Sequence, residues 1–260
     1  MISERFDVAG KSVLITGATG AFGAAAARGL AEAGAHLTLA GGSEDKLTEL
    51  VDDLRGSGSP VARVARRPDS EGDADAIVDA AIAAHGGVDV LITASGMNKV
   101  GLITEQSVDD WQSVMDANVR GSWLMCRAAG RHMIARGGGG KVILVSSTRA
   151  KLGLPSGYSA YSPSKAAIDL LTKTLACEWG AHGINVNAIG PTVFRSDLTA
   201  WMYADEPPGR TTREAMLARI PLGRLGEPDD FVGAVLFFAS AASDFCTGQT
   251  LYVDGGYTAG

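Results

Sequence analysis

Short apolar runs separated by amphipathic stretches recur along most of this chain. The runs are rich in Val, Ile and Leu, as is typical of buried strands, and they lie at 12–16, 36–40, 60–65, 88–92, 141–145, 184–189 and 250–253. Helical spacing of apolar residues lies between them, at 24–33, 44–54, 74–84, 107–118 and on through 133, 161–179 and 228–240. This alternation predicts a parallel sheet covered by helices.

The predicted fold class is α/β, a single domain built on a doubly wound parallel sheet of about seven strands with helices on both faces. The whole chain, 1–260, is expected to form this domain, with an insert at about 194–218. Ligands of such sheets bind at the carboxyl ends of the strands, near the reversal in strand order. Glycine, serine and proline motifs directly follow four of the predicted strands, so we expect them to converge on one crevice.

Composition narrows the class of protein. The net charge is −6, which gives no electrostatic case for binding nucleic acid or an anionic membrane. The N-terminus has no apolar signal region, and the longest apolar stretch, 231–242, is too short to span a bilayer. Cys126, Cys177 and Cys246 have no metal-ligand spacing, so no metal is expected and the thiols are predicted to be reduced core residues. The expected location is the cytoplasm.

Candidate acid/base chemistry lies in Ser146-Ser147, which closes an apolar strand, and in the run from Tyr161 to Lys165, which opens a helix. Residues four apart share a helix face, so Lys165 is expected beside Tyr161. A neighbouring ammonium favours the phenolate and would lower the pKa of the tyrosine from about 10 towards neutral pH. By itself, a Tyr-x-x-x-Lys pair is more often structural than catalytic.

A glycine-rich segment, 17–23, connects the first predicted strand to the first helix. Strand, glycine turn and helix together form the context in which backbone N–H groups at a helix N-terminus bind a pyrophosphate.

With these motifs, the chain resembles the short-chain dehydrogenase/reductase family over nearly its whole length, which implies a Rossmann-type sheet. The matching residues are Thr16, Gly17, Ala21, Gly23, Asn118, Ser147, Tyr161, Lys165, Pro191 and the ending 247–256. The resemblance implies a nicotinamide cofactor, NAD(P)(H), and hydride exchange between a secondary alcohol and a ketone, and it suggests a homotetramer.

The resemblance also implies roles for four catalytic residues. Tyr161 would exchange a proton with the substrate oxygen, which Ser147 would polarise. Lys165 would lower the pKa of Tyr161 and hold the nicotinamide ribose, and Asn118 would hold a water that links Lys165 to solvent. Because the loop to Tyr161 is one residue longer than usual, Ser146 is the second choice for the catalytic serine. Lys151 and Tyr158 are expected to join Ser147 and Tyr161 in binding substrate.

The cofactor residues expected from the resemblance are Gly17, Thr19, Gly20, Ala21, Phe22, Gly23, Gly42, Ser43, Ala94, Ser95, Gly96, Tyr161, Lys165, Pro191, Val193 and Ser196. Several depart from the family pattern. Ala21 replaces a glycine, 93–96 replaces Asn-Asn-Ala-Gly, and Arg67-Pro68 stands where an acidic residue usually lies, unless Asp69 takes that place. After the second strand, 41–43 offers neither a carboxylate for the ribose of NAD nor an arginine for the phosphate of NADP. Ser43, Lys46 or Arg67 could contact such a phosphate, which favours NADP(H) slightly; the alternative is that both cations are solvated surface charges.

Two substrate classes fit the predicted loops. The cations Lys99, Arg149, Lys151 and Arg195 favour an anionic or polyhydroxylated substrate, such as a sugar acid, and a likeness to the gluconate 5-dehydrogenase branch. The apolar residues Phe194, Leu198, Trp201, Met202 and Tyr203 instead favour a lid over a bulkier ketone. The insert is expected to be mobile and to close on ligand, and the apolar segments 231–238 and 251–257 are expected to serve a subunit contact.

Two other classes of function remain as alternatives. One is a catalytically silent, cofactor-binding regulatory or structural homologue, which the departures at Ala21 and 93–96 favour and the complete catalytic set disfavours. The other is a lyase or epimerase, a class that generally has longer chains with a separate substrate domain.

Overall fold

The predicted strands pair side by side in one parallel sheet. The computed structural model describes residues 2–153 and 157–259. Its strands are β1 (Ser12–Thr16), β2 (His36–Gly41), β3 (Val61–Ala65), β4 (Val90–Thr93), β5 (Gly140–Val145), β6 (Ile184–Pro191) and β7 (Thr250–Val253). They form a seven-stranded sheet in the order β3-β2-β1-β4-β5-β6-β7. The order therefore reverses between β1 and β4, where a doubly wound sheet opens a crevice.

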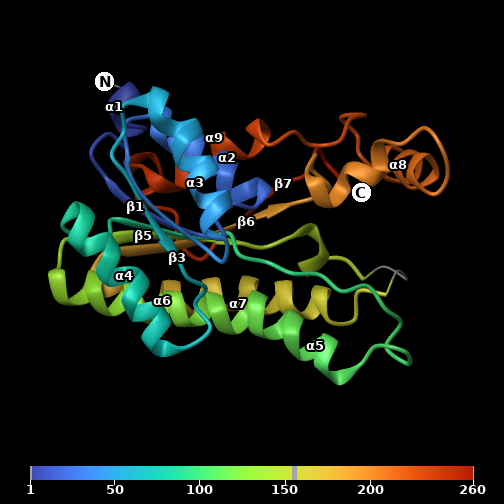
Figure 1. The fold of residues 1–260 in the computed structure, drawn as a ribbon, viewed down its shortest axis with the longest axis horizontal. Helices are drawn as coiled ribbons and strands as arrows, with labels where there is room; N and C mark the ends of the chain where they lie inside the picture. The colour runs from blue at the N-terminus through green and yellow to red at the C-terminus, as the bar shows by residue number, and fades with distance from the viewer. Residues whose placement is uncertain (1, 154–156, 260) are drawn as a thin grey trace.

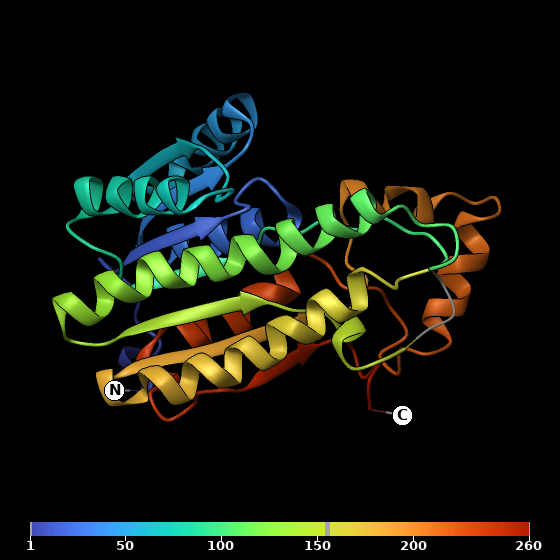
Figure 2. The ribbon, with the colours of Figure 1, turned by 90° about the horizontal axis from the view of Figure 1, so that it is seen from below.

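Helices cover both faces of this sheet (Figures 1 and 2). One face carries α2 (Ala21–Glu32), α3 (Glu44–Leu54) and α9 (Asp229–Ala239), and the other carries α4 (Glu71–His85), α6 (Gly121–Arg136) and α7 (Tyr161–Trp179). The remaining helices are α1 (Ile2–Arg5), α5 (Val108–Met115), which runs into α6 through a π-helical stretch, and α8 (Gly209–Leu217). The Rossmann-type architecture expected from the sequence is confirmed.

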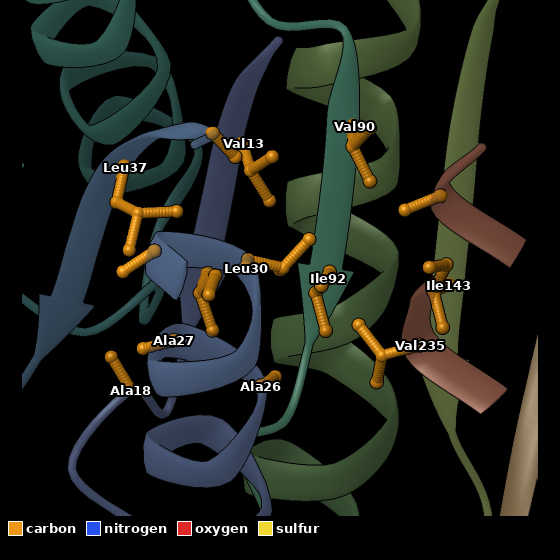
Figure 3. Close-up of a cluster of buried hydrophobic side chains, with 14 of the residues drawn as sticks. Val13, Ala18, Ala26, Ala27, Leu30, Leu37, Val90, Ile92, Ile143 and Val235 are labelled. Atoms are coloured by element: carbon orange, nitrogen blue, oxygen red, sulfur yellow. The ribbon is translucent and has the colours of Figure 1, made fainter. Parts of the chain in front are cut away.

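Alternating side chains of β1 to β6 enter two separate cores, one on each face of the sheet. Val13 and Ile15 pack on the α2 side, whereas Leu14 between them packs on the α4 side. Figure 3 shows the first core, in which Ala26, Ala27 and Leu30 of α2 face the strand residues. Small residues let helices approach closely: a Cβ on Gly29 of α2 would lie 2.2 Å from Val232 Cγ1 of α9. Both faces of the sheet are thus closed to ligands, and the carboxyl ends of the strands are left for the site.

The first turn of α2 differs from the first turns of its neighbours. Ser43, Ser70 and Ser107 cap α3, α4 and α5 by accepting a hydrogen bond from a backbone N–H three residues on. Gly20 stands at this position of α2 with no side-chain cap, and the first turn holds no acidic residue. The sequence predicted a start at residue 24, but the helix begins at Ala21, inside the glycine segment. The N-terminal N–H groups of α2 therefore lie in the turn that follows β1.

The expected helix 107–133 is broken by a π-helical stretch, Asp116–Arg120. The insert at 194–218 contains a 3₁₀ helix, η5 (Asp197–Tyr203), followed by α8. A third apolar cluster, of Ile220, Leu225 and Tyr257, takes in Leu152 from the loop after β5 and Met216 and Leu217 from α8. The insert therefore packs beside the loop that carries Ser147.

Two expectations about buried residues need correction. Only Cys126 is a core thiol, because Cys177 is exposed and Cys246 is half-buried, although all three are free as predicted. Much of the apolar segment 231–238, expected at a subunit contact, faces inward, where Phe231 and Phe238 belong to the core. In the second such segment Tyr257 is buried, whereas Leu251 is 41% exposed.

In the part of the chain that the structure describes, no helix has the length and hydropathy needed to cross a membrane.

Candidate active site

A groove of about 490 Å³ lies at the carboxyl ends of β1, β2 and β4, where the strand order reverses. The predicted cofactor residues that line it are Gly17, Thr19, Gly20, Gly42, Ala94, Ser95 and Gly96. Segments that are far apart in the sequence thus meet at one crevice, as parallel strand ends do.

The glycines of the first turn are required by close backbone approach. Gly17 has φ +67°, and a Cβ there would lie 2.4 Å from the backbone N of Ser95. A Cβ on Gly23 would lie 2.3 Å from the carbonyl O of Gly17. The backbone of the turn after β1 thus lies directly against the loop after β4, with no room for a side chain at Gly17.

Lys165 lies buried at the base of the site, one helical turn after Tyr161 on α7. The side chain is 3% exposed, and its Nζ donates to the Val145 carbonyl O at 2.8 Å. Burial lowers the pKa of Lys165 to about 8, and the nearby Asp169 carboxylate partly opposes this. A Cβ on Gly96 would lie 3.7 Å from Nζ, so the loop after β4 passes directly over the lysine. Lys165 is therefore a cation that releases its proton close to physiological pH.

Asn118 lies in the π-helical stretch between α5 and α6 and connects two segments of the site. Its Oδ1 accepts from the Met97 N–H at 2.7 Å, and its Nδ2 donates to the Met97 carbonyl O at 2.9 Å and to Ser164 Oγ at 2.8 Å. π-helical turns often occur at functional sites, and this one directs a buried amide to both loop and helix. The side chain of Asn118 thus fixes the loop after β4 to the first turn of α7.

Tyr161 is the first residue of α7, and its ring centroid lies 5.7 Å from Lys165 Nζ. The expected lowering of its pKa by Lys165 is not observed. Desolvation by burial raises the pKa of Tyr161, a hydrogen bond with Ser147 and the charge of Arg149 oppose that rise, and Tyr158 adds to it. The Lys165 ammonium is directed at the Val145 carbonyl, so burial dominates. Tyr161 therefore holds its proton at neutral pH.

The two candidate serines have different partners. Ser147 is hydrogen-bonded to Tyr161, and its Oγ also accepts from the Arg149 N–H at 3.2 Å. Ser146 Oγ instead donates to the backbone carbonyl of Lys165 at 3.4 Å, inside the protein. The geometry brings Ser147, Tyr161 and Lys165 together and places Ser146 in a packing position.

Other predicted residues lie outside the groove. The ring of Phe22 packs against Phe194 and Phe231, with centroids 5.1 Å and 4.9 Å away, and so belongs to the core. Ser43 caps α3, and Ser196 forms a capping box with Thr199 at the start of η5. Ala21 is the first residue of α2, a position at which the backbone N–H has no partner within the helix.

The residues predicted after β5 and β6 are also distributed away from the groove. Pro191 is buried at the end of β6, and Val193 packs on the third apolar cluster. The Nζ of Lys151 lies 5.3 Å from the Tyr252 ring, and Tyr158 stacks under Arg149 and lies 6.2 Å from the Tyr161 ring. Of these, Tyr158 is the one in contact with the catalytic cluster. In the proposed lid, Phe194 and Met202 are buried and Trp201 is 51% exposed, while the side chain of Leu198 lies outside the described residues.

The sequence missed one wall of the groove, which is formed by Ser113, Asp116, Ala117 and Gly121 of the α5–α6 segment; Met97, expected in a substrate wall, also lines the groove. The three- and four-residue spacing of the α5–α6 residues was a usable signal, because such residues share one face of a helix. Arg66, Arg67, Pro68 and Asp69 after β3 also line the groove, with Pro68 lying against Gly121, and of these four only Arg66 was not predicted.

These residues fit a nicotinamide dinucleotide. The free N–H groups at the N-terminus of α2 suit a pyrophosphate, and the glycines allow it to approach the backbone. Gly96 and Met97 line the groove and adjoin the catalytic residues, Gly96 near Asn118 and Lys165 and Met97 bonded to Asn118, so these residues would hold the nicotinamide end of a dinucleotide.

Comparison with known proteins agrees with this geometry. The family model described as enoyl-(acyl carrier protein) reductase matches residues 17–258. An oxidoreductase of Mycobacterium tuberculosis is 60% identical over 256 residues, covering 98% of this chain and 94% of the relative. The gluconate 5-dehydrogenase of Gluconobacter oxydans is 34% identical over 98% of this chain and 97% of its own.

Among solved structures, a gluconate 5-dehydrogenase from Burkholderia cenocepacia in complex with NADP and tartrate aligns with a TM-score of 0.92. It is 33% identical, and the alignment covers 100% of both chains. The chain therefore belongs to the short-chain dehydrogenase/reductase family of NAD(P)-dependent oxidoreductases.

Proposed function

We propose that this oxidoreductase exchanges a hydride between NADP(H) and a secondary alcohol or ketone, with Tyr161 as the acid/base. The observation that carries the proposal is the cluster of Ser147, Tyr161 and Lys165, whose lysine lies against Gly96 in the lining of the dinucleotide groove. Ser147 is hydrogen-bonded to the tyrosine, and the lysine is buried one turn further along α7. The bound nicotinamide would supply or accept the hydride.

The side chains would then handle the proton. Because burial keeps Tyr161 protonated at neutral pH, its hydroxyl is suited to donate a proton to a carbonyl oxygen during reduction. Ser147 would hold and polarise the same oxygen. In the direction of oxidation, the Ser147 hydrogen bond and the Arg149 charge would stabilise the phenolate that accepts the alcohol proton. Lys165, with its pKa of about 8, would replace the proton that Tyr161 gives up in reduction and take up the proton that Tyr161 gains in oxidation.

Asn118 would act as a positioning group. Its side-chain amide bonds to Met97 and Ser164, so it holds the two segments between which Lys165 lies. The water relay expected for Asn118 stays a prediction.

The preference for NADP(H) rests on the end of β2. A Cβ on Gly42 would lie 2.2 Å from Arg67 Nε, so the guanidinium lies directly over this glycine. Arg66 is paired with Asp73, whereas Arg67 has no ion pair among residues 2–153 and 157–259. A free guanidinium beside a strand end without a carboxylate suits a ribose phosphate. The Burkholderia cenocepacia relative was solved with NADP.

A fluorescence titration with NADPH and NADH, side by side, tests this preference. We expect tighter binding of NADPH, and Arg67→Gln should weaken NADPH binding about 10- to 100-fold, the value of a charged hydrogen bond, with little effect on NADH. The matched control is Arg63→Gln, which removes an exposed arginine paired with Glu44 at 2.7 Å. Equal loss of both coenzymes in Arg67→Gln would contradict the preference.

The relatives are dehydrogenases and oxidoreductases, and nothing in these findings favours a silent regulatory role. We retain the homotetramer and the cytoplasmic location as predictions. Exposed apolar side chains on α5 and α6 support an assembly, since Trp111 is 42% and Trp123 46% exposed. Light scattering would measure the number of subunits.

A further inference from the structure

The cations that the sequence offered for substrate recognition have different surroundings. Lys99 is paired with Asp110, and Arg195 is paired with Glu227 at 3.1 Å. Lys151 is exposed, with its ammonium over the Tyr252 ring. Neither Lys151 nor Arg149 pairs with a carboxylate within the described residues, but Arg149 differs from the other three in having a buried donor, Nη1, without a partner there. Of the four cations, Arg149 is therefore the one that brings an unsatisfied buried donor next to Tyr158, beside the catalytic cluster.

The guanidinium of Arg149 is held in place without being neutralised. It stacks on the Tyr158 ring, with Cζ 4.3 Å from the ring centroid, and Tyr158 in turn lies 6.2 Å from the Tyr161 ring. Its Nη1 is buried and has no hydrogen-bond partner among residues 2–153 and 157–259. Leaving a charged donor buried and unpaired costs more than a lost hydrogen bond normally does. We infer that a group of the ligand accepts a hydrogen bond from this donor.

Arg149 is also tied to the catalytic cluster through the backbone. Its N–H donates to Ser147 Oγ at 3.2 Å, and its positive charge opposes the rise that burial causes in the pKa of Tyr161. The short 3₁₀ helix Thr148–Ala150 after β5 therefore positions the polarising serine and the free guanidinium together. A substrate whose oxygen lies at Ser147 and Tyr161 would extend towards Arg149.

We propose that Arg149 binds a carboxylate of the substrate, so that this enzyme acts on oxo acids and their hydroxy acids in preference to neutral ketones. The inference rests on the proposed function and names its substrate class. A guanidinium matches the planar geometry of a carboxylate. Of the other cations, Lys99 and Arg195 are already paired and the Lys151 ammonium lies over the Tyr252 ring, so the observations favour a single carboxylate at Arg149, and a phosphate is compared in the test.

The test compares acids with their neutral esters. Pyruvate, acetoacetate and levulinate place the carboxylate at increasing distance from the ketone, and each has a methyl ester. NADPH oxidation is followed for the wild type, Arg149→Gln, Arg149→Lys and the control Arg195→Gln, with dihydroxyacetone phosphate against dihydroxyacetone as the phosphate comparison.

We expect at least one acid to be reduced better than its ester by the wild type. Arg149→Gln should raise the ratio of the KM for that acid to the KM for its ester about 10- to 100-fold. Because the Arg149 charge also acts on Tyr161, any change in kcat should be the same for the acid and the ester. Arg149→Lys should recover part of the preference, because the charge remains but the planar fork is lost. Arg195→Gln should behave as the wild type. Equal use of acids and esters, a preference for the phosphate, or a preference that survives in Arg149→Gln would overturn the proposal while leaving the oxidoreductase intact.

A binding measurement separates this proposal from failure of turnover. The melting temperature of the protein with NADPH is recorded with each acid and each ester, for the wild type and Arg149→Gln. The carboxylate site is supported, even if no ketone is reduced, when an acid raises the melting temperature of the wild type while its ester does not and Arg149→Gln shows no such rise. An equal shift in melting temperature with acids and esters refutes the carboxylate site, whether or not the ketones are reduced. A wild type that binds NADPH but reduces none of the ketones would count against the proposed function alone.

Discussion

Replacing Lys165 with methionine tests whether the buried Lys165 ammonium lowers the free energy of unfolding. Burial lowers the pKa of Lys165 from 10.5 to about 8, with Nζ bonded to the Val145 carbonyl. At about 1.4 kcal/mol per pKa unit, the charge costs the folded state about 3 kcal/mol at pH 7. Methionine removes this cost and loses one hydrogen bond worth about 1 kcal/mol. Lys165→Met should therefore be about 2 kcal/mol more stable than the wild type at pH 7.

The sign of the pH dependence follows from the direction of the shift. Between pH 8 and pH 10.5 the unfolded chain keeps a proton that the folded protein has released, so raising the pH stabilises the wild type. This gain in stability of the wild type is fully present above pH 10.5 and is lost as the pH falls through 8, where the folded protein takes up the proton. The advantage of Lys165→Met should shrink by about 2 kcal/mol between pH 7 and pH 9.5.

Urea unfolding of the cofactor-free protein, at one protein concentration and at both pH values, measures this difference. Lys173→Met serves as the control, because Lys173 is exposed on the same helix and should show no such change. If the advantage of Lys165→Met were the same at both pH values, Lys165 would titrate alike in the folded and unfolded states. The assignment of a lysine that releases its proton near pH 8 would then be wrong.

Three further outcomes are expected. Gly17→Ala should lower the urea midpoint and abolish NADPH binding, because its Cβ would meet Ser95 N at 2.4 Å in a turn with φ +67°; unchanged binding would refute the close approach. Asn118→Ala should cost at least about 2 kcal/mol of unfolding free energy, since Met97 and Ser164 lose buried partners; a cost under about 0.5 kcal/mol would contradict this. In the native protein a thiol reagent should label Cys177 and spare Cys126, whose pKa burial raises to about 12. Rapid labelling of Cys126 would contradict its burial.

Elements with strong local signals could be predicted closely from the sequence. The bounds of β1, β7 and α3 agree with the structure, and α3 has both a serine cap at Ser43 and buried leucines at helical spacing. The convergence of strand-end motifs also followed from topology, because parallel strands all end at one edge of the sheet. Most of the fold could therefore be predicted from local capping residues and burial patterns.

Features that depend on non-local contacts could not be predicted. Apolar spacing does not distinguish α from π turns, so the stretch that directs Asn118 towards Met97 and Ser164 went unseen. The effect of Lys165 on Tyr161 was overestimated, because a sequence shows the neighbouring charge but not the burial that opposes it. The free guanidinium of Arg149 was equally hidden, since pairing depends on carboxylates elsewhere in the chain.

The most direct test of the central claim, that Tyr161 is the acid/base beside a nicotinamide groove, compares Tyr161→Phe with the wild type. Single-turnover reduction is followed with NADPH and the ketone that the wild type reduces best, and NADPH affinity is measured by fluorescence in parallel. The account predicts a rate loss of about 10²- to 10⁴-fold with unchanged NADPH affinity, because only the proton donor is removed. A rate within about threefold of the wild type, at the same NADPH affinity, would show that another group moves the proton.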